Sequence, residues 1–231
     1  MKKKFVDLDS NNTAPIAMAA QSVRPNSTVL EFGCASGYLT RYLTEEKQCK
    51  VSICEVDADA AMEAAKYADN VVIGDCESME WVDKYANQRY DYILFTDVLE
   101  HLRDPGAVLC NARPLLKSSG KVCASIPNIS YKTVLIDLIQ HDRFEYVRDG
   151  ILDSSHLRFF TEKTAIALFE MNHFEVSKIN HFKGPVTKKE KSMKEFPLLI
   201  RWYLSKVNKN IETAVFYIEA VPNSVSSVNK D

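Results

Sequence analysis

The sequence predicts an α/β domain in which a mostly parallel sheet of about seven strands is covered by helices on both faces. Two observations carry this prediction. Over the first two thirds of the chain, apolar runs of strand length alternate with longer segments of helical character, as in repeated strand–helix units. In addition, acidic residues and small-residue turns follow several of the apolar runs, where open parallel sheets bind their ligands.

The expected strands are apolar runs bounded by turn residues. They cover residues 28–32, 50–55, 70–73, 90–96, 120–126, 174–180 and 213–221, and the last two form an antiparallel hairpin. Helices are expected at 38–43, where apolar side chains have helical spacing, at the alanine-rich run 58–67, and from Asp104-Pro105 to Leu115 ahead of a turn at 118–120. A further helix follows Thr161.

All of residues 1–231 are expected to form one domain, because the length and average composition suit one core with an elaboration. Residues 127–158, rich in aromatic and charged side chains, are expected to cap the carboxyl ends of the strands as a substrate lid. Residues 183–210 form a second cap insertion. Within it, the amphipathic stretch 196–207 is either a packed helix or a surface helix that docks on a membrane or a partner.

Charge, apolar runs and cysteine content argue against nucleic-acid-binding, membrane-spanning and exported proteins. The formal net charge is −2, so nucleic-acid binding is not expected without a local basic patch. No run approaches the roughly 18–20 apolar residues that span a bilayer, and Asp7 and Asp9 stand where a signal peptide needs apolar residues. The 6 cysteines show no C-x-x-C pairing, which favours reduced thiols and a cytoplasmic protein.

The most specific pattern spans residues 29–37, where a buried strand ends in an acid and a turn of small residues precedes a helix. Gly33 and Gly37 lack a Cβ atom and let the backbone pass close beneath a ligand. The next strand ends at Glu55, whose carboxylate can accept both hydroxyls of a ribose. Asp75 follows the third strand and can meet the exocyclic amine of adenine. These strand ends therefore predict a nucleotide-type ligand.

Residues 29–37, 51–57, 74–75 and 90–105 together resemble the successive motifs of class I S-adenosylmethionine (SAM)-dependent methyltransferases. The resemblance covers nearly the whole chain and implies a Rossmann-like fold, SAM as the cofactor and methyl transfer as the reaction. It places Glu31 and Gly33 near the methionine part of SAM, Glu55 at the ribose, and Asp75 with Cys76 at adenine.

The implied cofactor-binding residues are Glu31, Gly33, Cys34, Ala35, Gly37, Glu55, Val56, Asp75, Cys76 and Thr96. Ala35 departs from the usual glycine by one methyl group. An NAD enzyme, or a protein of this fold without activity, stays as the alternative.

Asp97, Glu100 and His101 follow the fourth strand within little more than one helical turn and can share a face. These residues either take part in the reaction at the strand ends, or they only cap, orient or pair with groups within the loop. With residues 125–128 and the later His156, they resemble the metal site of small-RNA 3′-end 2′-O-methyltransferases and, in part, of ubiquinone-pathway O-methyltransferases. That resemblance implies a divalent ion (manganese, magnesium or iron) held by Asp97, Glu100, His101 and His156, with a first acid shortened from Glu to Asp.

Without a metal, His101 or His156 is the candidate general base, because imidazole titrates near neutrality. Asp97 completes this predicted catalytic set. His156 has an alternative interpretation as a buried residue that holds its loop in place. Arg158 can bind a phosphate or carboxylate of the acceptor, or pair with a nearby acid.

Residues 149–161, with the helix after them and 171–176, resemble bacterial methyltransferases that accompany glycosyltransferases. This resemblance implies O-methylation of a small hydroxylated acceptor, such as a sugar or sugar derivative in surface-polysaccharide metabolism. Tyr131, Phe144, Tyr146 and Arg148 in the expected lid can stack on such an acceptor or bind its phosphate. The alternatives are metal-dependent methylation of an RNA 3′ end, which the low basicity disfavours, and a non-catalytic SAM-binding regulatory protein.

Overall fold

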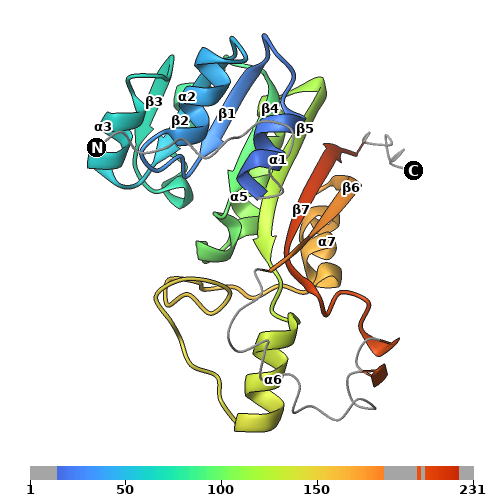
Figure 1. Cartoon of the computed structure of the whole chain (residues 1–231). Helices are drawn as coiled ribbons and strands as arrows, with labels where there is room; N and C mark the ends of the chain where they lie inside the picture. Colours follow the sequence, from blue (N-terminus) through green and yellow to red (C-terminus); the bar gives the residue numbers. More distant parts are fainter. Residues whose placement is uncertain (1–14, 185–201, 204–205, 224–231) are drawn as a thin grey trace.

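A sheet of seven strands in the order β3-β2-β1-β4-β5-β7-β6 forms the centre of the computed structural model (Figure 1). The structure describes residues 15–184, 202–203 and 206–223. The strands are β1 (Thr28–Phe32), β2 (Lys50–Glu55), β3 (Asn70–Ile73), β4 (Tyr90–Thr96), β5 (Leu116–Pro127), β6 (Phe174–Lys183) and β7 (Thr213–Pro222). Strands β1 to β5 pair in parallel, and β7 runs antiparallel to both of its neighbours, β5 and β6. The expected sheet and its antiparallel hairpin are confirmed.

Helices cover both faces of this sheet, as predicted. One face carries α1 (Pro15–Ser22), α2 (Tyr38–Glu45) and α3 (Ala58–Ala64), and the other carries α4 (Glu80–Tyr85), α5 (Pro105–Ala112) and α7 (Glu162–Met171). Successive residues of β1 belong to opposite cores: Val29 packs with the first set of helices and Leu30 with the second. A strand buried on both faces reads as a continuous apolar run, which is why these strands could be located from the sequence.

The connection between α5 and β5 differs from the prediction. The helix ends at Ala112, a 3-10 turn (Arg113–Leu115) follows, and β5 already begins at Leu116. The expected turn at 118–120 is wrong, because Leu116 pairs with Tyr90 and a register shift absorbs the residues up to Lys121. A Cβ atom on Gly120 would lie 2.7 Å from the carbonyl oxygen of Tyr90, so this bulge needs a glycine.

Residues 128–160 form the cap, which lies beyond the carboxyl end of β5 and contains α6 (Lys132–His141) and a long loop (Figure 1). The buried side-chain amide of Asn128 anchors it by donating to the carbonyl oxygens of Thr213 (2.8 Å) and Asn210 (3.1 Å). The second insertion lies mostly outside the described residues. Of the stretch 196–207 only 202–203 and 206–207 are described, and Trp202 and Tyr203 are exposed.

Two further features concern the state of the cysteines and the length of the helices. All six cysteines are free. Among the helices of the described residues, none is long and apolar enough to cross a bilayer.

Candidate functional site

The turn after β1 is built from residues with positive φ. Gly33 (φ +65°), Ala35 (φ +47°) and Gly37 (φ +79°) alternate along it. A Cβ atom on Gly33 would lie 2.6 Å from Cγ2 of Val98, and one on Gly37 would lie 2.6 Å from Cα of Ala64. Gly37 is therefore required by the packing of α2 on α3, and Gly33 by the close approach of the β4 loop.

Glu55 links this turn to the next strand end. Its buried carboxylate accepts hydrogen bonds from the backbone N–H of Ala35 (2.8 Å) and of Asp57 (3.0 Å), one at each oxygen. Each carboxylate oxygen has a second lone pair that these bonds leave available. Glu55 can thus hold the turn in place and still accept donors from a ligand.

A cavity of about 320 Å³, the glycine-loop cavity, lies in front of Glu55. Its lining residues are Gly33, Cys54, Glu55, Val56, Gly74, Asp75, Cys76, Glu77, Asp97, Val98, His101, Leu102, Arg103 and Leu157. Five of the predicted cofactor residues are among them: Gly33, Glu55, Val56, Asp75 and Cys76. The other five, Glu31, Cys34, Ala35, Gly37 and Thr96, do not line it.

The apolar wall of the glycine-loop cavity was missed by the sequence analysis. Val98 and Leu102 come from the loop after β4, and Leu157 comes from the cap. The spacing of four between Val98 and Leu102, beside the polar Asp97 and His101, is the only signal that could have indicated such a wall. Glu77 was also missed; its carboxylate accepts from the backbone N–H of Arg103 (3.1 Å) and Asp104 (2.7 Å) and so fixes the loop before α5.

Glu31 lies beneath the turn, on the α2 side of β1. Its carboxyl is buried and accepts a hydrogen bond from Oγ1 of Thr40 (2.7 Å). Burial raises the pKa of Glu31 to about 7, with Glu55 adding repulsion and the Thr40 bond opposing the rise. Glu31 therefore supports the turn from below.

We expect Glu31 to make folding stability depend on pH. Because the folded-state pKa is raised from 4.5 to about 7, Glu31 contributes stability that is complete below about pH 4.5 and is lost as the pH rises through about 7. The shift corresponds to about 3 kcal/mol. Urea unfolding at several pH values should show that Glu31→Gln gains up to that amount over the wild type between about pH 5 and pH 8. A constant difference between the two proteins would contradict this prediction.

Asp97 holds a strained position at the end of β4. It is a non-glycine residue with φ +53°. Its backbone N–H donates to Oγ of Ser125 (2.8 Å), and the same hydroxyl donates to Oδ1 of Asp97 (2.6 Å). Ser125 is fully buried on β5, so the neighbouring strand fixes both the backbone and the carboxylate of Asp97.

Glu100, His101 and His156 form a compact group although Glu100 and His156 are 56 positions apart in the sequence: one ligand atom from each lies within 4.8 Å of the other two. Nε2 of His156 is 4.0 Å from Oε1 of Glu100, and the two imidazole centroids are 4.7 Å apart. The cap loop is held there by the backbone N–H of Leu157 and Arg158, which both donate to the carbonyl oxygen of Glu100. Asp97 lies outside this group.

The protonation of the group follows from its surroundings. Nδ1 of His101 donates to the carbonyl oxygen of Ser155 (3.2 Å) and Nδ1 of His156 to that of Ile151 (3.0 Å), so the neutral form of each ring has its lone pair on Nε2. Burial and the neighbouring His156 lower the pKa of His101. Glu100 is 1 % exposed, and in the part of the chain that the structure describes neither carboxylate oxygen has a hydrogen-bond partner. Burial, with repulsion from Asp97, raises the pKa of this carboxyl well above its ordinary value.

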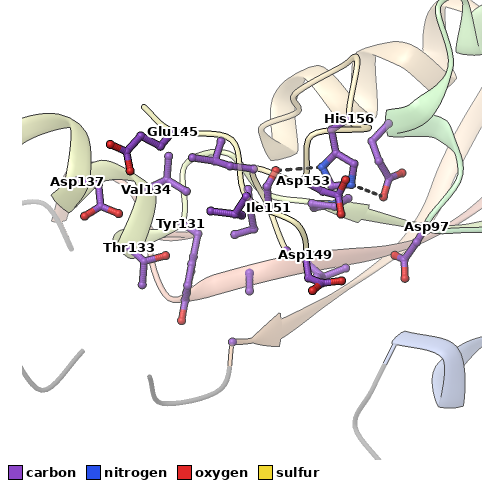
Figure 2. Close-up of a pocket in the computed structure, with 18 of the residues that line it drawn as sticks. Asp97, Tyr131, Thr133, Val134, Asp137, Glu145, Asp149, Ile151, Asp153 and His156 are labelled. Carbon is purple, nitrogen blue, oxygen red and sulfur yellow. Dashed lines mark hydrogen bonds and ion pairs between the residues drawn. The ribbon is translucent and has the colours of Figure 1, made fainter. Parts of the chain in front are cut away.

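A second cavity, the cap cavity, has a volume of about 620 Å³ and lies between the cap, the carboxyl ends of β4 and β5, and the amino end of the antiparallel β7 (Figure 2). Its lining residues are Asp97, Glu100, His101, Pro127, Tyr131, Thr133, Val134, Asp137, Arg143, Glu145, Val147, Asp149, Gly150, Ile151, Leu152, Asp153, His156, Gly184, Ala214 and Val215. Asp97 and His101 line both cavities. The cap cavity and the glycine-loop cavity therefore adjoin each other at these two side chains.

The residues expected to contact an acceptor divide into two sets. Tyr131 lines the cap cavity. Phe144 and Tyr146 do not; they pack edge-on against each other, and Phe144 also packs against Phe159. Arg148 and Arg158 line neither cavity, and Nε of Arg158 donates to the carbonyl oxygen of Arg103 (3.1 Å).

Comparison with known proteins gives a family match and distant relatives. Residues 8–179 match the family model described as a methyltransferase domain. A ubiquinone biosynthesis O-methyltransferase of Coxiella burnetii (strain Dugway 5J108-111) is 30% identical over 113 residues, 48% of each chain. One from Serratia proteamaculans (strain 568) is 27% identical over 162 residues, 62% of this chain and 66% of that protein. The chain spans about half the length of the first of these curated relatives.

Solved structures share the fold at low sequence identity. A SAM-dependent methyltransferase from Archaeoglobus fulgidus has a TM-score of 0.58 and 18% identity, covering 86% of both chains. Magnesium protoporphyrin IX methyltransferase from Synechocystis PCC 6803 has a TM-score of 0.54 and 14% identity, covering 90% of this chain and 80% of that one. At these identities the likeness concerns the fold.

Proposed function

The chain belongs to the methyltransferase domain family, and we propose that it moves the methyl group of SAM onto a hydroxyl of a small acceptor held in the cap cavity. That it is a SAM-dependent methyltransferase follows from the family. The observation that carries the finer proposal is the junction of the two cavities at Asp97 and His101. A donor on one side and an acceptor on the other would meet at these side chains, which is the alignment that in-line transfer requires.

The glycine-loop cavity fits SAM by its chemistry. Glu55 offers two carboxylate oxygens for the ribose hydroxyls, and Asp75 offers an acceptor for the adenine amine. Val98, Leu102 and Leu157 supply the apolar surface on which an adenine ring packs. When bound, SAM supplies a methyl group on an already charged sulfonium. The protein's task is then to orient the acceptor oxygen and remove its proton.

Glu100, His101 and His156 fit a divalent cation. The two oxygens of Glu100 are buried without a partner, and each histidine directs a lone pair away from the carbonyl group that fixes its ring. One carboxylate with two imidazoles suits manganese or iron, and Asp97 is near enough to influence the pKa of Glu100. A bound cation would lower the pKa of an acceptor hydroxyl. In its absence Nε2 of His101 is the available base, kept neutral by its lowered pKa.

We propose a sugar or sugar derivative as the acceptor, with a role in surface-polysaccharide metabolism. Its support is the resemblance of residues 149–161 to methyltransferases that accompany glycosyltransferases, together with Tyr131 in the cap cavity. The relatives named as O-methyltransferases support oxygen as the accepting atom. A cytoplasmic location, and a peripheral membrane contact through 196–207, stay predictions.

A second candidate is methylation of an RNA 3′ end. The group of Glu100, His101 and His156 favours it, because these residues resemble the metal site of the small-RNA 3′-end 2′-O-methyltransferases. The carboxylates that line the cap cavity oppose it, since the RNA backbone is anionic. Transfer to a short RNA, with none to sugars, would decide for this candidate.

Methyl transfer should depend on a divalent ion. We expect chelator-treated protein, supplied with labelled SAM and a panel of sugars and sugar nucleotides, to lose at least tenfold in rate and to recover it with added manganese. SAM binding, measured by calorimetry in the same samples, is the control and should change little. Undiminished turnover in chelator would remove the metal and leave His101 as the base.

A further inference from the structure

The described walls of the cap cavity carry more negative than positive charge. Besides Asp97 and Glu100, four carboxylates line it: Asp137, Glu145, Asp149 and Asp153. Apart from the two histidines, Arg143 is the one basic side chain among the described lining residues. Its Nε lies 3.5 Å from Oε1 of Glu145, so the two exposed side chains form an ion pair, and the three other carboxylates leave the lining with a net negative charge.

These carboxylates are spread along the cavity, as Figure 2 shows. Asp97 and His156 lie at one end, where the glycine-loop cavity begins, and Asp137 and Glu145 lie at the opposite end, beside α6. Asp149 lies between the two ends, where Ile151 contributes apolar surface, and Val134 lies beside Asp137 and Glu145. A bound molecule would therefore have one end at the methyl-transfer position and its other end among acids.

Glu100 independently marks the cap cavity as a place where a ligand binds. This residue lines the cavity, is 1 % exposed, and has two carboxylate oxygens without a hydrogen-bond partner among the described residues. A buried polar group without a partner costs free energy that a bound ligand or cation can recover. Glu100 thus marks the methyl-transfer end of the cap cavity. The acids along the rest of the cavity favour a ligand whose remaining part is positively charged.

We propose that the acceptor is a hydroxylated compound bearing a protonated amine, with its hydroxyl at Asp97 and His101 and its amine toward Glu145 and Asp149. This proposal rests on the proposed O-methyltransferase function. The amine is attracted to these carboxylates and a phosphate is repelled by them; because Glu145 and Asp149 are exposed to solvent, both effects are moderate and weaken with salt. Phosphorylated sugars and nucleotide sugars are consequently poor acceptors, and an amino sugar is a good one. Specificity of this kind comes as much from repulsion of the wrong ligand as from attraction of the right one.

A matched series of sugars tests the proposal: glucosamine, N-acetylglucosamine and N-acetylglucosamine 6-phosphate. They share a ring and differ in carrying a positive, a neutral and a negative group. Their affinities are measured by ligand-observed NMR on the full chain with S-adenosylhomocysteine bound, so that no turnover is needed. We expect glucosamine to bind at least tenfold more tightly than the phosphate, which corresponds to about 1.4 kcal/mol, and the difference to shrink with added salt.

The double variant Glu145→Gln, Asp149→Asn should reduce this preference to about threefold or less. Both substitutions act in the same direction, because the first also releases the charge of Arg143. Glu170→Gln, at an exposed acid of α7 that lines neither cavity, is the matched control and should keep the preference. Equal affinities in the wild type, tighter binding of the phosphate, no measurable glucosamine binding, or a preference unchanged in the double variant would each overturn the proposal. Since binding is read without turnover, these results are distinct from a failure of methyl transfer itself.

Discussion

Replacing Glu55 with alanine should abolish measurable binding of SAM and S-adenosylhomocysteine, with a loss of at least a hundredfold. The carboxylate is buried, lines the glycine-loop cavity, and already holds the turn after β1 through the N–H of Ala35. Its removal takes away two charge-assisted acceptors for the ribose, each worth about 1.5–3 kcal/mol, and loosens the turn on which Gly33 lies. Calorimetric titration with both ligands measures the loss.

Two controls separate the binding role of Glu55 from general damage. Glu55→Gln keeps the size and one acceptor oxygen and should bind SAM with an intermediate affinity. Glu46→Ala changes an exposed acid after α2 and should bind like the wild type. Circular dichroism checks that all three variants are folded. Wild-type affinity in Glu55→Ala would exclude a ribose contact at this residue, and the cofactor would then have to lie elsewhere.

The sheet could be predicted because its strands are buried on both faces and therefore stand out as apolar runs. The short helix α4, from Glu80 to Tyr85, was not expected. Its apolar contribution is largely Trp81 and Tyr85, too few positions to establish a period. The α5–β5 boundary was misplaced because Gly120, a common turn residue, marks a bulge inside a strand.

The candidate site was predictable in its chemistry and unpredictable in its geometry. Residue type and position after a strand were sufficient to single out Glu55 and Asp75, since the carboxyl ends of parallel strands meet at one edge. Loop conformation decided the rest. Arg158 donates a hydrogen bond to the carbonyl oxygen of Arg103, and Phe144 packs on Phe159 instead of facing the cap cavity. No periodicity in the sequence encodes such long-range contacts.

His156 shows how far a sequence pattern reaches. The sequence offered it as a ligand, a base or a buried residue that holds its loop, and the structure places it 4.0 Å from Glu100 with its Nδ1 bonded to the carbonyl of Ile151. That bond holds the loop, and the free Nε2 faces Glu100. Holding the loop and serving as a metal ligand are therefore compatible roles, because a ligand histidine needs its other nitrogen fixed by a hydrogen bond.

Glu100→Gln should make the metal-free protein more stable and remove its response to manganese. A buried polar group without a hydrogen-bond partner costs about 1–3 kcal/mol and an ionised one costs more, and a neutral amide of the same shape avoids the part of the cost that comes from the charge. Because the folded-state pKa of Glu100 is raised above its ordinary value of 4.5, the wild type is most stable below that pH. It loses this stability as the pH rises through the folded-state pKa. The variant should lack this part of the loss.

Manganese should reverse the order of stability of the wild type and Glu100→Gln. A ligand that binds only the folded state at a hundred times its Kd adds about 2.7 kcal/mol, so we expect the wild type to gain several degrees in Tm and Glu100→Gln to gain little. His156→Asn serves as a second variant, because it removes a different ligand while leaving the Glu100 charge in place. It should lose the manganese response without becoming more stable in the absence of metal. Equal manganese stabilisation of all three proteins would show that Glu100 serves the loop alone. If Glu100→Gln is instead more stable than the wild type without metal and gains less from manganese, the Glu100 carboxylate lowers the stability of the fold and is needed for metal binding.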